Sequence, residues 1–414
     1  MSILIKNIGK LMQVEDTPVA FVAGKDMSEV HYTDNAWLLT EDDIIAGFGS
    51  METLPAGIHA DEVIDACGGF VFPSFCDSHT HLVFAGSRER EFVDKIRGLS
   101  YEEIAKRGGG ILNSARRLHD TSEDELFEQS MVRVNEIIRF GTGAAEIKSG
   151  YGLTTEDELK MLRVIRRIKE ESPLTVKSTF LGAHAVPDPY RDDREKYVDL
   201  IVNEMLPAVA AEKLADYVDV FCDRGFFTVK ETERILERAA EFGMRPKIHA
   251  NELDFSGGIE TGVKYRALSV DHLECTDDAQ INVLLGSGTM PTLLPGAAFF
   301  LNIKNPPARQ MINAGLPVAL ASDYNPGTSP SGNMKFVLSL ACIKMKMLPE
   351  EAINAATINS AYAMGLSGTH GSIAVGKQAN VFITSHIPSY AFIPYAFTAD
   401  IISTVILNGE IISR

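Results

Sequence analysis

Histidine and aspartate side chains recur where short apolar stretches of the sequence end. His79-Thr80-His81 closes one such stretch, and His249 and Asp323 close two others. In a β-strand, side chains two residues apart share a face, so both histidines of the H-x-H pair can reach one ion. The pair alone is weak evidence in a chain with ten histidines, because two histidines bonded to the backbone would also explain it.

Three imidazoles and one carboxylate form a donor set that is typical of a catalytic metal ion. The set comprises His79, His81, His249 and Asp323. It would leave one coordination position open to water, as catalytic sites do, and a bound ion lowers the pKa of such a water towards neutrality. We expect one Zn²⁺ or Fe ion per subunit, since imidazole and carboxylate ligands suit both metals.

Two further residues are candidates for proton transfer beside this ion. Glu252 follows His249 by three residues, just beyond the predicted strand, where a partly buried carboxylate can act as a general acid or base. A loop glutamate in solvent is the alternative. His272 ends another apolar stretch and is a candidate second proton carrier or electrostatic partner. A structural histidine in the core is the alternative for that position.

Eight short apolar or β-branched runs, each ending in polar residues, alternate with helix-like segments. This alternation predicts an α/β fold, a closed (β/α)₈ TIM barrel, with an open doubly wound sheet as the alternative. The C-terminal ends of barrel strands share one mouth, where barrel enzymes keep their active sites. The predicted strands are Val71–His79, Gly143–Ser149, Val176–His184, Tyr217–Asp223, Arg245–Asn251, Ala267–Glu274, Thr289–Pro295 and Val318–Asp323.

Capping boxes predict where three of the helices begin. In such a box a Ser or Thr is followed three residues later by Glu, and the two side chains satisfy backbone N–H groups reciprocally. Each of the three precedes a helical apolar pattern. The boxes are Ser100-x-x-Glu103, Thr155-x-x-Glu158 and Thr228-x-x-Glu231.

The two chain ends read as short strands and turns, for example Ala36–Leu39 and Val381–Thr384. Each end is too short to bury much surface alone, so we expect both to pair in one small β-sandwich module. The glycine-rich stretch Gly365–Gly376 is typical of a linker. We therefore predict a module of residues 1–65 and 367–414 beside a barrel of residues 66–366.

Composition excludes several classes of protein. The 39 Lys and Arg against 56 Asp and Glu give a net charge of −17, so nucleic acid is not an expected partner. Five cysteines without a C-x-x-C spacing indicate a reducing compartment and no thiolate zinc site. The N-terminus lacks a signal-peptide core, and no apolar run is long enough to span a membrane. These features favour a cytoplasmic protein.

Six stretches of the sequence carry a family resemblance. They are Phe72–Arg88, Glu146–Leu153, Phe180–His184, Lys247–Ala250, Asp271–Glu274 and Asp323–Thr328. On these residues, and over essentially its whole length, the chain resembles the amidohydrolase superfamily and, within it, the imidazolonepropionase family. The H-x-H pair marks only the superfamily, whereas Leu82–Arg88 and Lys148–Gly152 are specific to the family.

The resemblance implies hydrolysis of 4-imidazolone-5-propanoate to N-formimidoyl-L-glutamate, which opens a cyclic amide during L-histidine degradation. The implied partner is a small anionic substrate, and we expect a homodimer. Glu252, with Asp323, would take a proton from water and return it to the departing ring nitrogen. His272 would stabilise the tetrahedral intermediate.

The resemblance also implies a set of substrate contacts. The Arg88 guanidinium suits the propanoate, because guanidinium pairs bidentately with carboxylates; a surface arginine beside Arg90 and Glu91 is the alternative. A turn after Asp323 can offer donors to the α-carboxylate of the product. The predicted substrate-binding residues are Arg88, Tyr151, His184, Glu252, Asn325, Gly327 and Thr328.

A single metal ion is expected because relatives with two metals bridge them by a carboxylated lysine that ends the fourth strand. That strand here ends in Val220–Asp223, without a lysine. Lys148 ends the second strand instead, and we expect it to pair with Glu146 or with a neighbouring residue. Two alternatives remain at this point. One is a mononuclear purine or pyrimidine aminohydrolase, whose uncharged base would give Arg88 no partner; the other is a metal-free barrel with a scaffold role.

Departures from the family pattern are few. Asn251 stands where Asp is expected, and Ser322 stands where Thr is usual before the metal-binding aspartate. The tail module carries Gln378-Ala379-Asn380. Asn251 removes a possible charge beside the metal, which bears on rate and metal preference and not on the type of reaction.

Overall fold

Eight parallel strands form a barrel in the computed structural model of the chain, which describes residues 1–99, 103 and 109–412. Hydrogen bonds join the strands in the order β13-β12-β11-β10-β9-β8-β7-β6. The ring closes where Asp323 N donates to His79 O at 3.0 Å and His81 N donates to Tyr324 O at 2.9 Å. The predicted (β/α)₈ TIM barrel is confirmed, and the doubly wound alternative is wrong. The strands are β6 Phe75–Thr80, β7 Thr142–Lys148, β8 Thr175–Ala183, β9 Tyr217–Cys222, β10 Arg245–Ala250, β11 Ser269–His272, β12 Met290–Leu293 and β13 Ala319–Leu320.

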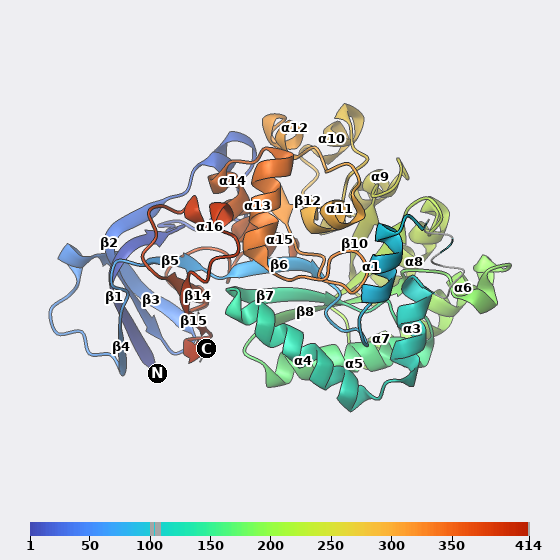
Figure 1. Ribbon diagram of the computed structural model, residues 1–414, viewed down its shortest axis with the longest axis horizontal. Helices are drawn as coiled ribbons and strands as arrows, with labels where there is room; N and C mark the ends of the chain where they lie inside the picture. The colour runs from blue at the N-terminus through green and yellow to red at the C-terminus, as the bar shows by residue number, and fades with distance from the viewer. Residues whose placement is uncertain (100–102, 104–108, 413–414) are drawn as a thin grey trace.

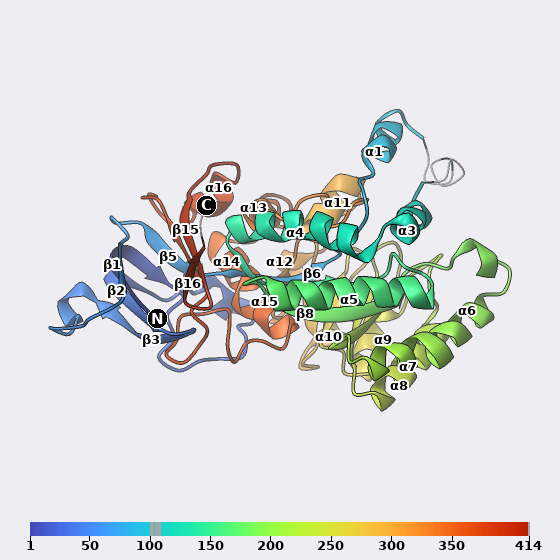
Figure 2. The same ribbon diagram turned by 90° about the horizontal axis from the view of Figure 1, so that it is seen from below.

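Helices surround the barrel and cover its outer face (Figures 1 and 2). The longest helices are α4 and α5. Each buries apolar residues that recur at helical spacing, for example Ile137 on α4 and Ile165 on α5. None of the described helices combines the length and apolar character needed to cross a bilayer. The helices are α1 Glu89–Ile96, α3 Ile111–Asp120, α4 Glu123–Arg139, α5 Thr155–Glu171, α6 Arg194–Leu200, α7 Leu206–Ala211, α8 Val229–Glu241, α9 Gly258–Lys264, α10 Asp278–Leu284, α11 Pro295–Leu301, α12 Ala308–Asn313, α13 Met334–Met345, α14 Pro349–Ala356, α15 Ile358–Ala363 and α16 Phe392–Tyr395.

Both chain ends build the small β module at the left of Figure 1, where the two termini also lie. Its strands form one mixed sheet of the order β16-β15-β14-β5-β1-β2-β3, with β4 paired to β1. Ile5, Leu38, Ile383 and Ile406, from both ends of the chain, share one buried cluster. The strands are β1 Ser2–Met12, β2 Tyr32–Glu41, β3 Ile44–Ser50, β4 Glu62–Asp65, β5 Phe70–Pro73, β14 Val381–Thr384, β15 Ile402–Leu407 and β16 Glu410–Ile412.

The predicted first barrel strand, Val71–His79, is in fact two strands. β5 pairs with β14 in the module, and β6 begins the barrel after a break at Ser74. The break cannot be seen in the sequence, because both strands are buried and together form one continuous apolar run. The division into 1–65 with 367–414 and 66–366 stays a proposal, with β5 belonging to the module sheet.

One predicted capping box is confirmed and one is wrong. Thr228 and Glu231 cap α8 reciprocally. The start of α5 is instead capped by Thr154, whose hydroxyl accepts from Asp157 N. The side chain of Glu158 accepts hydrogen bonds from three backbone N–H groups of residues 150–153, so it shapes the loop after β7. The third box begins at Ser100, which lies outside the described residues.

A buried carboxylate reinforces the closure of the barrel. Asp77 on β6 accepts from the backbone N–H of Ser322 at 2.9 Å and from its hydroxyl. Ser322 directly precedes Asp323, and both Asp77 and Ser322 are fully buried. The hydroxyl of Ser322 therefore links the turn after β13 to β6 beside the site.

Burial raises the pKa of Asp77 to about 7, so its carboxylate is charged only above that pH. At pH 8 or higher we expect Ser322→Ala to lower the free energy of unfolding by about 1.5–3 kcal/mol, the usual contribution of a hydrogen bond to a charged group. Urea denaturation measures this loss. Ser329→Ala is the matched control, because Ser329 donates to a neutral acceptor, the carbonyl of Ser322, at 2.7 Å. It should cost about 0.5–1.5 kcal/mol. Equal losses in the two variants would contradict a special role for the Asp77 contact.

Candidate metal and substrate site

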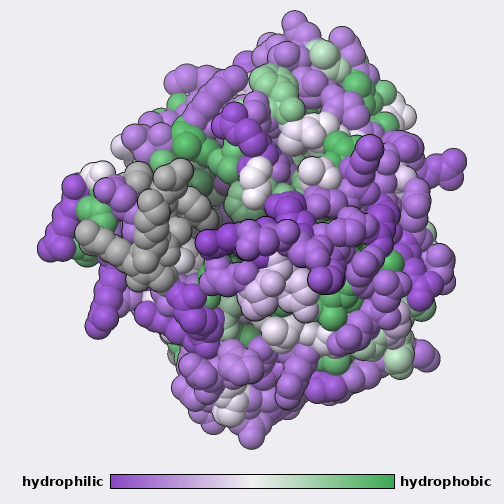
Figure 3. Space-filling model, turned by 90° about the vertical axis from the view of Figure 1, so that its right-hand side faces the viewer, coloured by the Kyte–Doolittle hydropathy of each residue, from purple (hydrophilic) through white to green (hydrophobic). Residues whose placement is uncertain are grey.

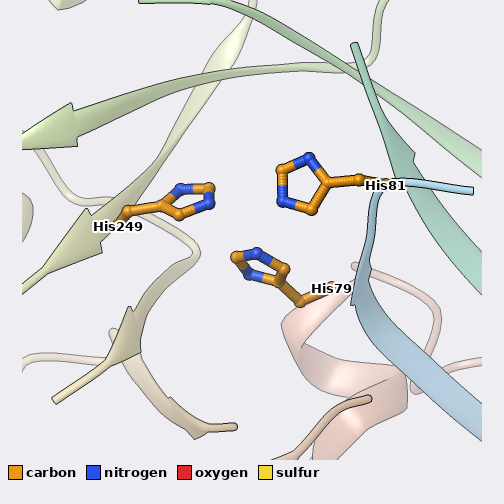
Figure 4. A group of neighbouring side chains, drawn as sticks. All are labelled: His79, His81 and His249. Atoms are coloured by element: carbon orange, nitrogen blue, oxygen red, sulfur yellow. The ribbon is translucent and has the colours of Figure 1, made fainter. Parts of the chain in front are cut away.

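The four predicted metal ligands meet in the mouth of the barrel. His79 and His81 come from the end of β6, His249 from β10 and Asp323 from the turn after β13. Asp323 Oδ1 lies 3.6 Å from His79 Nε2 and 3.5 Å from His81 Nε2. Figure 4 shows the three imidazoles turned toward one another, and they offer nitrogens within 4.8 Å of each other. All four residues are buried.

The protonation and pairing of these imidazoles fit a metal ion. The Nε2 atoms of His79 and His249 are buried and have no hydrogen-bond partner within the described part of the chain. Buried polar atoms are rarely left in this state without a bound group. Burial holds the pKa of His79 and His81 well below the usual range and lowers that of His249 to about 4. The three rings are therefore neutral, as metal ligands must be.

Two carboxylates behind the rings fix their orientation. Asp271 Oδ2 is hydrogen-bonded to His79 Nδ1 at 2.7 Å. Asp219 holds His249 by accepting from its backbone N–H at 3.1 Å, and its other oxygen, Oδ2, lies 3.0 Å from His249 Nδ1 as an ion-pair contact. A carboxylate that accepts the Nδ1 proton leaves Nε2 free to ligate. The distance of 2.5 Å between Lys148 Nζ and Glu146 Oε1 bears out the expected pairing of this lysine.

Glu252 and His272 face each other beside the four ligands. His272 Nδ1 lies 3.7 Å from Glu252 Oε2 and 3.9 Å from Glu274 Oε2. Burial raises the pKa of Glu252 to about 7 and that of Asp323 to about 6. Burial opposes the charge of His272, but the facing carboxylates outweigh it and raise its pKa to about 10. Glu252 is 8% exposed, which excludes the solvent-exposed alternative for this residue.

The loop that carries Glu252 is held in place from the neighbouring strand. The carboxylate of Asp223, just past β9, accepts from Glu252 N at 2.7 Å and from Leu253 N at 2.9 Å. Asn251 adopts a positive φ of 55°, a conformation that asparagine tolerates better than most residues. Its side-chain amide donates to Cys275 O at 2.9 Å. An ionised aspartate could not donate this bond.

Tyr151 and His184 lie together beside His81. The rings of His81 and His184 stack with centroids 5.2 Å apart, and Tyr151 lies 5.3 Å from His184. His184 Nδ1 lies 2.9 Å from Gly150 O, so its Nε2 is left as an acceptor. Burial lowers the pKa of His184 to about 3. The two side chains are therefore neutral groups that can orient a planar ring.

Arg88 is close to the predicted product-binding turn, but it already has a carboxylate partner. Glu91 Oε2 accepts from Arg88 Nε at 3.0 Å and from Nη2 at 2.6 Å. A Cβ at Gly327 would lie 2.1 Å from Arg88 Nη1, so the absence of a side chain there lets the guanidinium approach the turn. The side chain of Arg88 is only 9% exposed, which excludes a freely solvated surface arginine.

The hydrogen-bond donors of the turn after Asp323 are bonded within the turn and to Asp323. Asn325 Oδ1 accepts from Gly327 N and Thr328 N, each at 2.8 Å, and Asn325 Nδ2 donates to Asp323 O at 2.7 Å. Thr328 Oγ1 donates to Asp323 Oδ2 at 3.3 Å. These donors hold Asp323 in the structure, and their contribution to product binding stays a prediction.

Sequence reasoning missed the residues that act behind the site. Asp219 and Asp271 interrupt apolar strands (Val218-Asp219-Val220, Val270-Asp271). A charged residue within a buried strand needs a partner, and this was the signal that could have identified both aspartates. Glu274 is 1% exposed, and neither of its carboxylate oxygens has a hydrogen-bond partner among the described residues. Glu91 gave no signal, because a glutamate near the start of a helix is common on protein surfaces.

Comparison with known proteins places the chain in a family. The model of the amidohydrolase family matches residues 70–412. A curated imidazolonepropionase of Flavobacterium johnsoniae is 58% identical over 412 residues, covering 100% of both chains.

Two solved structures share the fold at much lower identity. The 5-methylcytosine deaminase of Klebsiella pneumoniae, liganded with 5-fluorocytosine, is 18% identical with a TM-score of 0.73, covering 100% of this chain and 97% of its own. A variant of the atrazine chlorohydrolase of Arthrobacter aurescens, complexed with zinc and atraton, is 14% identical with a TM-score of 0.71, covering 99% and 94%. At this identity they bear on the fold and not on the reaction. The chain belongs to the amidohydrolase family and, within it, to the imidazolonepropionases.

Proposed function

We propose that the chain hydrolyses 4-imidazolone-5-propanoate to N-formimidoyl-L-glutamate, a step of L-histidine degradation. One observation carries the reaction class: three neutral imidazoles and Asp323 converge in the barrel mouth beside the buried Glu252–His272 pair. The substrate is inferred from the name of the full-length relative at 58% identity.

The donor set His79, His81, His249 and Asp323 would hold one ion, for which zinc and iron are both suitable. When bound, such an ion supplies Lewis-acid activation of water at neutral pH. Asp219 and Asp271 would keep two of the ligand imidazoles in the tautomer that presents Nε2.

Glu252 would move the proton in this reaction. A carboxylate with a pKa of about 7 can take a proton from water and return it to the departing ring nitrogen at neutral pH. His272, 3.7 Å away and kept cationic by Glu252 and Glu274, would stabilise negative charge on the substrate oxygen. Asp323 would assist the proton transfer as well as bind the ion.

Arg88 would bind the propanoate of the substrate, with Tyr151 and His184 against its ring. Glu91 already occupies Nε and Nη2 of Arg88, which leaves Nη1, toward Gly327, for a carboxylate. Asn325, Gly327 and Thr328 would contact the α-carboxylate of the product, which hydrolysis of the ring C–N bond forms from the ring carbonyl.

The setting that we propose for this reaction is a cytoplasmic homodimer with no nucleic-acid partner. The net charge of −17 repels a phosphate backbone. The face of the barrel farthest from the module is largely hydrophilic, with small separate apolar areas (Figure 3).

The direct test of the function is an assay with freshly prepared 4-imidazolone-5-propanoate. Loss of the ring absorbance, with N-formimidoyl-L-glutamate identified by mass spectrometry, supports the proposal. Turnover of cytosine or adenine derivatives without turnover of the imidazolone would favour an aminohydrolase instead.

We expect one metal ion per chain, and no activity in the metal-free protein. Elemental analysis gives the stoichiometry, and re-addition of Zn²⁺ or Fe²⁺ to the chelated enzyme shows which ion restores turnover. His249→Ala should lose the ion, whereas His119→Ala should keep it, because His119 lies on α3 and pairs with Asp157. Two ions per chain, or full activity without metal, would contradict the site.

Glu252→Gln should lower kcat by about 10²–10⁴-fold, the usual contribution of general acid–base catalysis. The wild-type kcat should fall as the pH drops below about 7, since the protonated carboxyl cannot accept a proton. The variant should lack this dependence and keep its metal. Asp254→Asn, two residues along the same loop, is the control and should stay near wild type. A Glu252→Gln variant that loses its ion would reassign Glu252 as a ligand.

Arg88→Ala should lower kcat/KM by about 30-fold to several thousand-fold, since removing one partner of a buried charge pair costs roughly 2–5 kcal/mol. Arg88→Lys should recover only part of the loss, because an ammonium keeps the charge but cannot hold Glu91 with two N–H groups in one plane and offer a further one to the substrate. The loss should shrink for an imidazolone that lacks the carboxylate. Arg90→Ala, at an exposed position, is the control. An equal loss on both substrates would make Arg88 a structural residue.

A further inference from the structure

A cluster of five charged side chains lies inside the barrel, beneath the candidate metal site. It comprises Lys148, Lys247, Glu146, Asp219 and Asp271, each at most 1% exposed. We call it the buried charge cluster. Its two positive and three negative charges leave a net charge of −1, and the reaction proposed above uses neither lysine.

The two lysines of the buried charge cluster have different neighbours. Lys148 Nζ lies 2.5 Å from Glu146 Oε1, 2.8 Å from Asp219 Oδ2 and 3.7 Å from Asp271 Oδ2. Lys247 Nζ also pairs with Glu146, but its other contacts are the backbone carbonyls of Ser78 and Ala363. Lys148 is thus the cation that touches both aspartates.

Each of these aspartates in turn holds one of the predicted metal ligands. Asp271 pairs with His79 Nδ1 at 2.7 Å. Asp219 contacts His249 twice, at Nδ1 over 3.0 Å and at the backbone N–H over 3.1 Å. One ammonium group therefore connects the supports of two imidazoles that come from opposite parts of the sequence.

We propose that Lys148 is a positioning residue for the metal site, which fixes Asp219 and Asp271 and through them the orientation of His79 and His249. The inference rests on the metal set of the proposed function. Without Lys148 the cluster would carry −2 in a site closed to water, where an uncompensated buried charge is strongly unfavourable. An aspartate that has lost its ammonium partner would move away from this position, and the imidazole in front of it would lose the contact that orients its Nε2.

Lys247 provides a matched comparison, because both lysines are fully buried and share Glu146. In Lys148→Met/Glu146→Gln, one positive and one negative charge are lost, and the net charge stays −1. In Lys247→Met/Glu146→Gln, the same charges are lost, but Lys148 still contacts both aspartates. The two variants thus differ only in which lysine remains.

The experiment measures the affinity of each full-length variant for Zn²⁺ by competition with a chromophoric chelator. We expect Lys148→Met/Glu146→Gln to bind Zn²⁺ about 10–100-fold more weakly than wild type, as other losses behind metal ligands do. Lys247→Met/Glu146→Gln should stay within about threefold of wild type. Circular dichroism and the unfolding midpoint of the metal-free proteins separate lost affinity from lost structure.

The outcomes distinguish this inference from the proposed function. Equal affinities in the two double variants, or a tighter site without Lys148, would overturn the role of Lys148 and leave the hydrolysis untouched. A wild-type chain that binds neither Zn²⁺ nor Fe²⁺ would overturn both. If Lys148→Met/Glu146→Gln does not fold, Lys148→Arg, which keeps the charge, decides: retained affinity supports the inference, and a loss equal to that of His249→Ala overturns it.

Discussion

Closure of the barrel between β6 and β13 is the constraint on which the site depends. It places Asp323 beside His79 and His81, although more than 240 residues separate them in the sequence. The same seam carries the hydrogen bonds of Asp77 to Ser322. The backbone hydrogen bonds from Asp323 N to His79 O and from His81 N to Tyr324 O fix the register at this seam, and with it the position of Asp323 beside the imidazoles.

A second constraint follows from burying so many polar groups in one place. Imidazoles pointing into the mouth are held neutral by burial, while the aspartates behind them are compensated by lysine. Glu252 and Glu274 both face the cationic ring of His272, so this group of side chains is suited to proton transfer. The charged side chains behind the imidazoles are thus held in ion pairs, whereas those around Glu252 can exchange a proton.

The proposed substrate end of the mouth is built from a different kind of contact. Arg88 is anchored by Glu91, which also accepts from Gly110 N and Asn113 Nδ2. The guanidinium is therefore already oriented before any ligand arrives, which reduces the entropy lost on binding. An arginine fixed in this way favours one carboxylate position over others and would serve selection of an anionic substrate.

Strand-end histidines, the alternation of strands with helices and the family motifs allowed the sequence by itself to predict the barrel, the module of both chain ends and the four candidate ligands. These features are local or periodic, so a linear reading captures them. Sequence reasoning did not find the break at Ser74, the cap at Thr154, or the partners Asp219, Asp271 and Glu91. Those depend on which buried groups face each other across the barrel, and only tertiary packing decides how a charge inside a protein is compensated.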